Sequence, residues 1–219
     1  MFSPRLEILP PAQRLLWPRL YPVLANCFVL YRGTAIALRL GHRVSVDFDF
    51  FTERLLDKRE MRLQLLFLGG SIVLQESANG LTVMVPVESA GEVKVSFFGS
   101  LDFGRVGSPD VTEDGVMRVA SLEDLMATKL KVVLDRVEAK DYVDIAALLK
   151  AGASLTHGMA AARALYGQSF QASESLKALV YFEGGDLENL TLDQKQLLIE
   201  AVSHVETLPD TGIISHTLS

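Results

Sequence analysis

The chain has 219 residues, of which 49% are hydrophobic and 22% are charged, a composition typical of a globular protein with a sizeable core and not of a disordered chain. Its net charge of −6 excludes a surface that binds polyanions generally, so contact with nucleic acid requires a local basic patch. The single cysteine, Cys27, cannot form an internal disulfide, and no apolar run reaches the length of a membrane span, so we expect a cytoplasmic protein without membrane contact.

A strand, a glycine turn and a short helix are predicted in residues 27–41. The run CFVLYR is typical of a short buried strand, and Gly33-Thr34 follows it directly. The next residues, AIALRLG, favour a helix with Thr34 as a possible N-cap and Gly41 as its stop.

Residues 43–51, RVSVDFDFF, alternate strictly between polar and apolar side chains. This alternation predicts a strand with one buried face and one face available for function. The apolar face comprises Val44, Val46, Phe48 and Phe50, and the polar face comprises Arg43, Ser45, Asp47 and Asp49.

The remaining sequence divides into a strand-rich part and a helical part. An amphipathic helix over residues 53–70, with Leu55, Leu63 and Leu66 among its core-facing leucines, precedes a hairpin around Asn79-Gly80 and a strand over residues 92–98. From Ser121 the chain is helical, with capping patterns at Ser121/Asp124 and Thr191/Gln194. We therefore expect an α+β fold: residues 1–110 form a mixed sheet of about four or five strands with flanking helices, and residues 111–219 form a helical bundle.

Two features of this pattern suggest nucleotide chemistry. Asp47 and Asp49 direct both carboxylates to one side of a strand, where they could hold one or two Mg²⁺ ions. The solvated face of an edge strand would show the same sequence pattern. Gly33-Thr34 could offer backbone N–H groups and a hydroxyl to a phosphate, or be only a turn and a cap. A phosphate-type turn, a short helix and then paired carboxylates is the order that a metal-assisted nucleotide site requires.

This combination resembles the signature of the nucleotidyltransferase superfamily, and RGTAIALRLGHRVSVDFDFF is similar in particular to the AbiEii/AbiGii toxin family. The family pattern runs Gly-Gly-Thr-Ala, a leucine-rich helix, His-Arg and Ser-x-Asp-Phe-Asp-Phe. A second match, SLEDLMATKLKVVLDRVEAKDYVDIAALL, resembles the family's Lys-Leu step, an arginine one heptad later, and a basic residue followed by Asp-x-x-Asp. The resemblance spans residues 28–149 and implies a nucleotidyltransferase-like fold.

The resemblance also implies roles for individual residues. Asp47 and Asp49 would bind Mg²⁺ and act in catalysis with Lys129 and Asp144, while Asp144 orients Lys129 or helps to activate the acceptor. Lys129 and Arg136 lie seven residues apart, which predicts one shared helix face. Asp141 would pair with Arg136 or cap its own helix, and helix-surface salt bridges are the alternative. The nucleotide contacts would come from Arg32, Gly33, Thr34, Arg43, Ser45 and Arg136.

Three positions depart from the family pattern. Arg32 stands where the first of two glycines is usual, and Lys140 stands where an arginine is usual. Many nucleotidyltransferases take a third metal-binding carboxylate from a later strand, and here Ser96 aligns with that acid. Glu92, on the same predicted strand face, is a possible substitute, although every two residues along a strand add about 7 Å.

The expected activity is Mg²⁺-dependent transfer of a nucleoside monophosphate from an NTP to a hydroxyl of a tRNA 3′ end or of a protein. The resemblance further implies a toxin that has a separate antitoxin protein as its partner. The alternative, motivated by Arg32 and Ser96, is a nucleotide- or protein-binding module that keeps the fold and lacks transfer activity.

Overall fold

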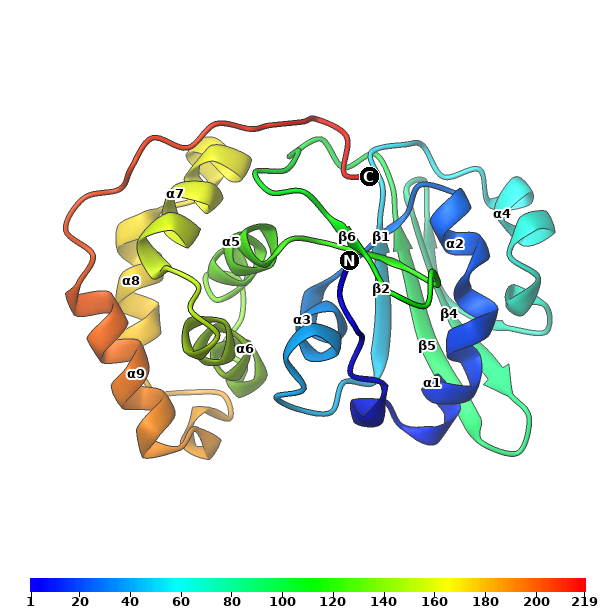
Figure 1. Cartoon of the computed structure of the whole chain (residues 1–219), viewed down its shortest axis with the longest axis horizontal. Helices are drawn as coiled ribbons and strands as arrows, with labels where there is room; N and C mark the ends of the chain where they lie inside the picture. The colour runs from blue at the N-terminus through cyan, green and yellow to red at the C-terminus, as the bar shows by residue number, and fades with distance from the viewer. The chain divides into compact units, whose positions relative to one another are not determined.

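The computed structural model describes all 219 residues, which form two compact units (Figure 1). The sheet unit comprises Met1–Gly104, Ser108–Ala120 and Ser215–Ser219. The helical unit comprises Arg105–Gly107 and Ser121–Ile214. The chain passes between the units within residues 105–120; a domain boundary at residue 110 itself stays a prediction.

The sheet unit contains one mixed sheet of seven strands in the order β3-β4-β5-β2-β1-β7-β6. The pairs β2/β5 and β1/β7 are parallel, and the other pairs are antiparallel. The expected count of four or five strands was wrong because the connection contributes β6 and β7, which at two residues each are too short to show alternation. The strands are β1 (Val29–Tyr31), β2 (Asp47–Phe51), β3 (Ile72–Ser77), β4 (Gly80–Val87), β5 (Gly91–Phe98), β6 (Asp110–Val111) and β7 (Arg118–Val119).

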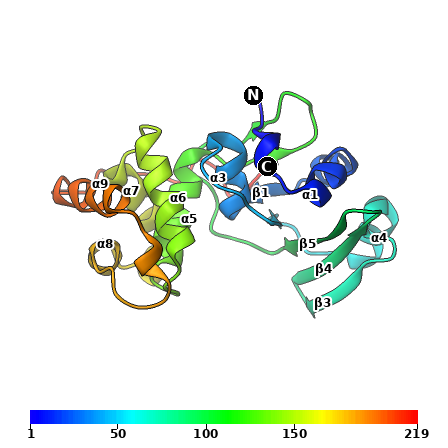
Figure 2. The same cartoon turned by 90° about the horizontal axis from the view of Figure 1, so that it is seen from below.

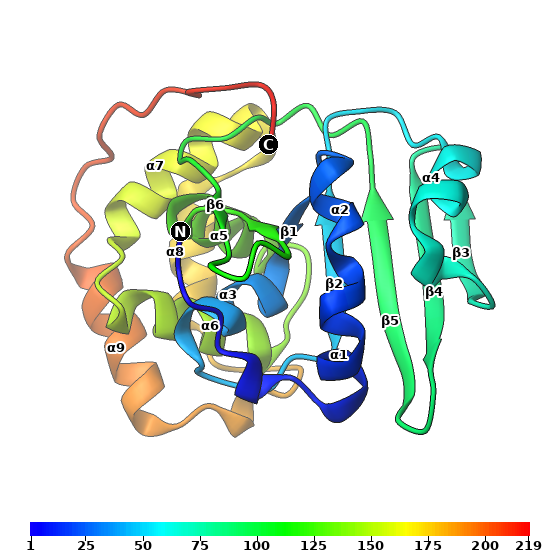
Figure 3. The same cartoon turned by 45° about the vertical axis from the view of Figure 1, so that its right-hand side comes forward.

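Helices cover one face of this sheet. Helix α1 lies against β4 and β5. Figure 3 shows α1 and α2 in front of β2, and α4 in front of β4. Figure 2 shows the same arrangement from below, with β3, β4 and β5 side by side and α4 against them. The helices are α1 (Pro11–Leu16), α2 (Pro22–Ala25), α3 (Arg32–Leu40) and α4 (Lys58–Gln64), with 3₁₀ turns at Leu6–Ile8, Trp17–Leu20 and Leu66–Leu68.

The core lies between these helices and the inward side chains of the central strands. Phe48 and Phe50 on β2 and Phe97 on β5 are completely buried, and the ring centroids of Trp17 and Phe48 are 6.2 Å apart. Because side chains alternate along a strand, the neighbouring residues of β2 and β5 project from the opposite face of the sheet.

Strand β2 is shorter than the alternation predicts. It begins at Asp47, and Val44 and Val46 are 60% and 59% exposed rather than part of the core. The pairing with β5 begins at Asp47, opposite Lys94, so residues 43–46 have no neighbouring strand that would hold them extended. Alternation in sequence therefore overestimated the strand by four residues.

The helix expected over residues 53–70 is reduced to α4 and a 3₁₀ turn. Met61 and Leu65 are buried, whereas Leu55, Leu63 and Leu66 are exposed, contrary to the prediction. The helix ends at Gln64 because its C-cap, Leu65, leaves the helical region (φ −96°, ψ 74°), so the 3.6-residue period does not extend across the segment.

The helical unit contains five α-helices, and both predicted capping patterns are confirmed. The Ser121 hydroxyl accepts a hydrogen bond from the Asp124 N–H (3.0 Å), and Thr191 and Gln194 form a reciprocal capping box. No helix of the chain combines the length and hydropathy needed to cross a bilayer. The helices are α5 (Leu122–Val132), α6 (Ala139–Lys150), α7 (Leu155–Tyr166), α8 (Ala172–Val180) and α9 (Leu192–Ser203), with 3₁₀ turns at Gly167–Ser169 and Leu187–Asn189.

Candidate functional site

Asp47 and Asp49 lie on the sheet face opposite the helix-covered core. The buried rings of Phe48 and Phe50 hold β2 from the other side, and the parallel register places Asp47 beside Lys94 and Asp49 beside Ser96. The Asp47 side chain is 39% exposed and the Asp49 side chain 12% exposed. The two carboxylates thus share one face but differ in their access to water.

Each of these carboxylates has a basic side chain next to it. Arg32 Nη1 is 3.5 Å from Asp49 Oδ1, and Lys94 Nζ is 3.6 Å from Asp47 Oδ2. Lys94 was not among the predicted site residues, because its proximity to Asp47 depends on the pairing register of β2 with β5, which the sequence does not state. Its only sequence signal is that it shares a strand face with Ser96.

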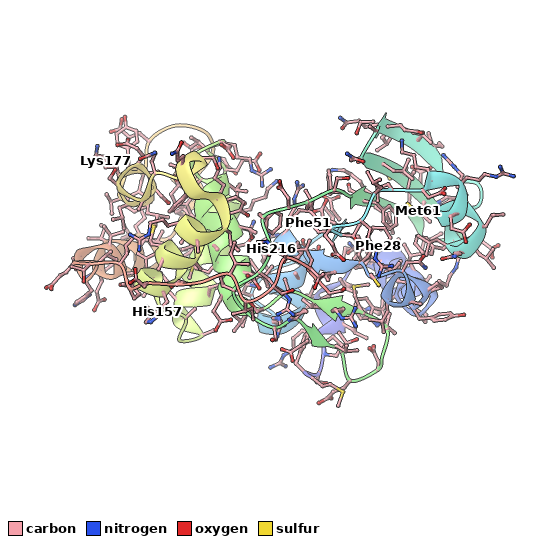
Figure 4. The ribbon with its side chains drawn as sticks, turned by 90° about the horizontal axis from the view of Figure 1, so that it is seen from above. Phe28, Phe51, Met61, His157, Lys177 and His216 are labelled. Carbon is pink, nitrogen blue, oxygen red and sulfur yellow. The ribbon has the colours of Figure 1, made fainter.

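Arg32 has the backbone conformation of a glycine. Its φ of +62° lies in the left-handed region, which explains why glycine is usual at this position of the motif. Its guanidinium lies over the rings of Phe98 (4.8 Å) and Phe51 (5.5 Å). Phe51, labelled in Figure 4, stacks in turn on Tyr31 with ring centroids 4.8 Å apart. These contacts direct the Arg32 cation toward Asp49.

Thr34 fastens helix α3 to the start of β2 and is not the N-cap that the sequence suggested. The helix begins at Arg32 with Tyr31 as N-cap, and the Thr34 hydroxyl is buried. It is hydrogen-bonded to Ser45 Oγ (2.8 Å) and to the backbone carbonyl of Asp47. The predicted stop at Gly41 is confirmed, with φ +66°.

Gly33 and Arg43 lie near the two ends of this region. Gly33 occupies the first turn of α3, where backbone N–H groups have no partner within the helix. Arg43 lies in the segment before β2, and its Nη1 donates to the carbonyl of Val44 (3.0 Å). The structure therefore brings Arg32, Gly33, Thr34 and Ser45 together around the beginning of β2, and their contacts with a nucleotide stay a prediction.

The electrostatics of the pair centre on Asp49. Burial raises the pKa of Asp49 above its usual range, and the neighbouring Asp47 carboxylate raises it further. Arg32, Lys94 and a hydrogen bond from Ser96 act in the opposite direction without cancelling the effect. An ionised Asp49 is therefore poorly solvated even beside Arg32 and Lys94, which favours the arrival of a further cation.

The residues around the pair fit one Mg²⁺ ion. Magnesium is usually held by one or two carboxylates together with water and substrate phosphates, and Asp47 and Asp49 supply such a pair. The chain has no cluster of three or more acidic, histidine or cysteine side chains of the kind that encloses a metal. Glu92 pairs with Pro86 on β4 and lies two residues outside the part of β5 that pairs with β2, so it does not replace a third acid beside Asp49.

In the helical unit, Lys129, Asp141 and Asp144 form a buried ion cluster. Lys129 Nζ lies 2.6 Å from Asp141 Oδ1 and 2.6 Å from Asp144 Oδ2, and both carboxylates are fully buried. Arg136 completes the cluster, with Nε 2.8 Å from Asp141 Oδ2 and Nη2 3.1 Å from Asp141 Oδ1. Asp141 thus pairs with Arg136, which was one of its two expected roles.

The shared helix face expected for Lys129 and Arg136 was wrong. Helix α5 ends at Val132, and Arg136 lies in the connection to α6. Its bidentate contact with Asp141, and not helical spacing, brings it into the cluster. Burial acts to raise the pKa of Asp141, but the hydrogen bonds and charges of Arg136 and Lys129 outweigh burial and hold this pKa below its usual range. Lys140 lies outside the cluster and pairs with Glu138 (2.6 Å).

Comparison with known proteins identifies the family. Residues 14–209 match the family described as "Nucleotidyl transferase AbiEii toxin, Type IV TA system". The chain belongs to this family. An uncharacterised protein of Aquifex aeolicus (strain VF5) is 30% identical over 163 residues, which cover 73% of this chain and 76% of that protein.

Two solved structures have a similar fold. MenT4, a nucleotidyltransferase toxin from Mycobacterium tuberculosis H37Rv, has a TM-score of 0.53 at 13% identity over 86% of this chain and 90% of that chain. An antigenic nucleotidyltransferase-like protein from Paracoccidioides brasiliensis has a TM-score of 0.54 at 14% identity over 88% and 94%. The AbiEii chain described here therefore has the nucleotidyltransferase-like α+β fold that its motifs predicted.

Proposed function

We propose that this AbiEii protein transfers a nucleoside monophosphate from an NTP to a hydroxyl acceptor in a Mg²⁺-dependent reaction. The observation that carries the proposal is the pair Asp47 and Asp49, held on one sheet face by buried phenylalanines and flanked by Arg32 and Lys94. Two converging carboxylates with adjacent cations suit a substrate that arrives as a magnesium–triphosphate complex.

In the proposed reaction, the acceptor oxygen forms a bond to the α-phosphorus while the bond to the bridging oxygen of the β-phosphate breaks. Pyrophosphate leaves with the electron pair, and the hydroxyl proton passes to solvent. Mg²⁺ held by Asp47 and Asp49 would neutralise phosphate charge and polarise the α-phosphoryl group. Arg32 and the first-turn N–H groups of α3 bind phosphate oxygens, and Thr34 and Ser45 fix α3 against β2.

The family motif also implies site residues within the helical unit. Lys129 and Asp144 are proposed as catalytic residues and Arg136 as a triphosphate or acceptor contact, following the family motif. Arg136 is partly exposed, so its guanidinium can contact a ligand while it remains paired with Asp141. Lys129 is enclosed by two carboxylates, which supports a role for Asp144 in orienting it.

We propose a tRNA 3′ end or a protein hydroxyl as the acceptor, and a separate antitoxin protein as the physiological partner. The partner follows from the family description as toxins of type IV toxin–antitoxin systems. The acceptor classes follow from the chemistry, since both present a nucleophilic hydroxyl.

The test is transfer of label from each α-³²P-labelled NTP, with Mg²⁺, to total tRNA or to the proteins of a lysate from the native host. We expect label in one of these pools with the wild-type chain and a loss of at least about 100-fold in Asp47→Asn, because the metal-binding pair is removed. Glu88→Gln, an exposed acid in the turn between β4 and β5, is the matched control and should transfer normally.

A second candidate function rests on the pairing of both carboxylates with Arg32 and Lys94 and on Ser96 in place of an acid. Such a chain would bind nucleotide or protein without transferring anything. Saturable NTP binding by the wild-type chain, with no labelled acceptor in either pool, would establish this binding module in place of the transferase.

A further inference from the structure

We infer that Lys94, together with Arg32, supplies the positive charge that a second divalent ion provides in two-metal sites, so that this transferase works with a single Mg²⁺. The inference rests on the proposed function and concerns how that same site is built. It assigns Lys94 a direct electrostatic role at the site, beside Asp47.

The first support is the register of the central strands. The parallel pairing of β2 with β5 places Lys94 directly beside Asp47 and Ser96 beside Asp49. The strand that would carry a third metal-binding acid therefore presents an ammonium group and a hydroxyl on the acid-bearing face. Thr82 on β4, opposite Ser96 in the next pair, donates to the Ser96 hydroxyl (3.3 Å) and adds no charge.

The second support is the charge balance. Three carboxylates and two divalent ions, the usual composition of a two-metal site, together carry one net positive charge. Here Asp47 and Asp49 are balanced by Arg32 and Lys94 before any metal binds. One Mg²⁺ then leaves a surplus of two positive charges facing the triphosphate, whereas two ions would leave four with only two carboxylates to hold them.

The third support is the length and solvent exposure of the two ion pairs. The side chains of Arg32 and Lys94 are about half-exposed, and their charged nitrogens lie 3.5 and 3.6 Å from the carboxylates, longer than a close ion pair. Such pairs contribute little to stability, so the Lys94 ammonium can turn toward a phosphate oxygen when Mg²⁺ reaches the carboxylates, while the Arg32 guanidinium stays over the rings of Phe51 and Phe98.

The test counts bound ions with Mn²⁺ and a non-reactive NTP analogue, using electron paramagnetic resonance and a binding titration. We expect one Mn²⁺ per chain with the spectrum of an isolated ion. Lys94→Glu replaces the cation by a carboxylate and should bind two Mn²⁺ ions close enough to be spin-coupled, about 4 Å apart. Lys177→Glu, on the exposed surface of α8, makes the same charge change elsewhere and should bind one.

Two further variants test Lys94 without adding a ligand. Because its ammonium competes with a metal for Asp47, Lys94→Gln should bind Mn²⁺ without nucleotide about two- to fivefold more tightly than the wild type. Lys94→Arg keeps the charge and should behave as the wild type does. A residue with a merely structural role would show neither the tightening nor its dependence on charge.

Three results would each overturn the inference. They are spin-coupled ions in the wild-type chain, one ion in a folded Lys94→Glu variant, and unchanged Mn²⁺ affinity in Lys94→Gln. If Lys94→Glu does not fold, the Gln and Arg variants decide. These results are distinguishable from failure of the proposed function, which is the absence of label transfer from any NTP to either acceptor pool and which leaves the number of bound Mn²⁺ ions unchanged.

Discussion

Arg32 combines a left-handed backbone with a guanidinium that lies over two phenylalanine rings beside Asp49. A non-glycine residue in this conformation lowers the stability of the fold by about 1–2 kcal/mol. The Arg32 side chain therefore has to make a favourable interaction that offsets this loss. Its position next to a carboxylate, at the first turn of a helix, suits a phosphate contact. An arginine at this position strains the backbone but places a cation beside Asp49.

Substitutions at Arg32 separate the backbone from the side chain. Arg32→Gly and Arg32→Ala both remove the cation, but only glycine relieves the conformation at φ +62°. We expect Arg32→Gly to be more stable than Arg32→Ala by up to about 1 kcal/mol in urea unfolding, the reverse of the usual order within a helix. Equal stability, or a more stable alanine variant, would show that the left-handed backbone is not strained.

Asp49 is expected to lower stability at neutral pH. Since burial raises its pKa in the folded chain, folding favours the protonated form, and this contribution to the free energy of unfolding declines as pH rises above about 4. Asp49→Asn should therefore be more stable than the wild type at pH 7, by on the order of 1 kcal/mol, and the difference should shrink at acid pH. Thermal unfolding across pH measures it, and a less stable Asp49→Asn at pH 7 would contradict the account.

At the scale of elements, β2 depends on a few buried rings and not on its whole alternating sequence. Phe50→Ala removes a completely buried ring and should lower the free energy of unfolding by about 3–5 kcal/mol. Val44→Ala, in the exposed segment before β2, should change it by less than about 0.5 kcal/mol. Denaturant titration compares them, and a large loss in Val44→Ala would mean that the strand extends as far as its alternation.

The order of the elements and the orientation of the acid pair could be predicted from sequence because both follow from local patterns. Alternation around Phe48 and Phe50 places Asp47 and Asp49 on one face, and the Gly41 stop and the Ser121 and Thr191 caps are likewise local signals. Such features need no knowledge of which strands pair.

Features that depend on contacts distant in sequence could not be predicted. The pairing of Lys94 with Asp47 depends on strand register, and the start of β2 depends on where β5 begins to pair with it. Likewise, α5 ends before Arg136, whose partner Asp141 lies on the next helix. Helical or strand periodicity alone says nothing about these tertiary partners.

At the scale of the whole molecule, the two units use buried carboxylates in opposite ways. In the sheet unit the pKa of Asp49 is raised by burial, whereas in the helical unit Arg136 and Lys129 lower the pKa of Asp141 despite its burial. In our proposal the first carboxylate binds a ligand, whereas the second stabilises its own unit. This difference between the two carboxylates is expected when a functional site lowers the stability of the fold.

Asp141→Asn should accordingly behave in the opposite way to Asp49→Asn. A lowered pKa means that the ionised carboxylate stabilises the folded chain above pH about 4, and this stabilisation is lost as pH falls toward the folded-state pKa. Removing the charge leaves Lys129 with one fewer partner, so we expect a loss of about 3–5 kcal/mol at pH 7 that narrows in acid. A loss that does not depend on pH would indicate that packing, and not charge, holds this cluster.

The most direct test of nucleotidyl transfer compares α-³²P- and γ-³²P-labelled forms of the same NTP in parallel incubations with Mg²⁺ and the acceptor pool. Attack at the α-phosphorus predicts acceptor label from the α-labelled nucleotide only, with all of the γ-label released as pyrophosphate and both signals lost in Asp47→Asn. Acceptor label from the γ-labelled nucleotide, or α-label transfer that persists in Asp47→Asn, would contradict the assignment of this chain's chemistry to the Asp47–Asp49 pair.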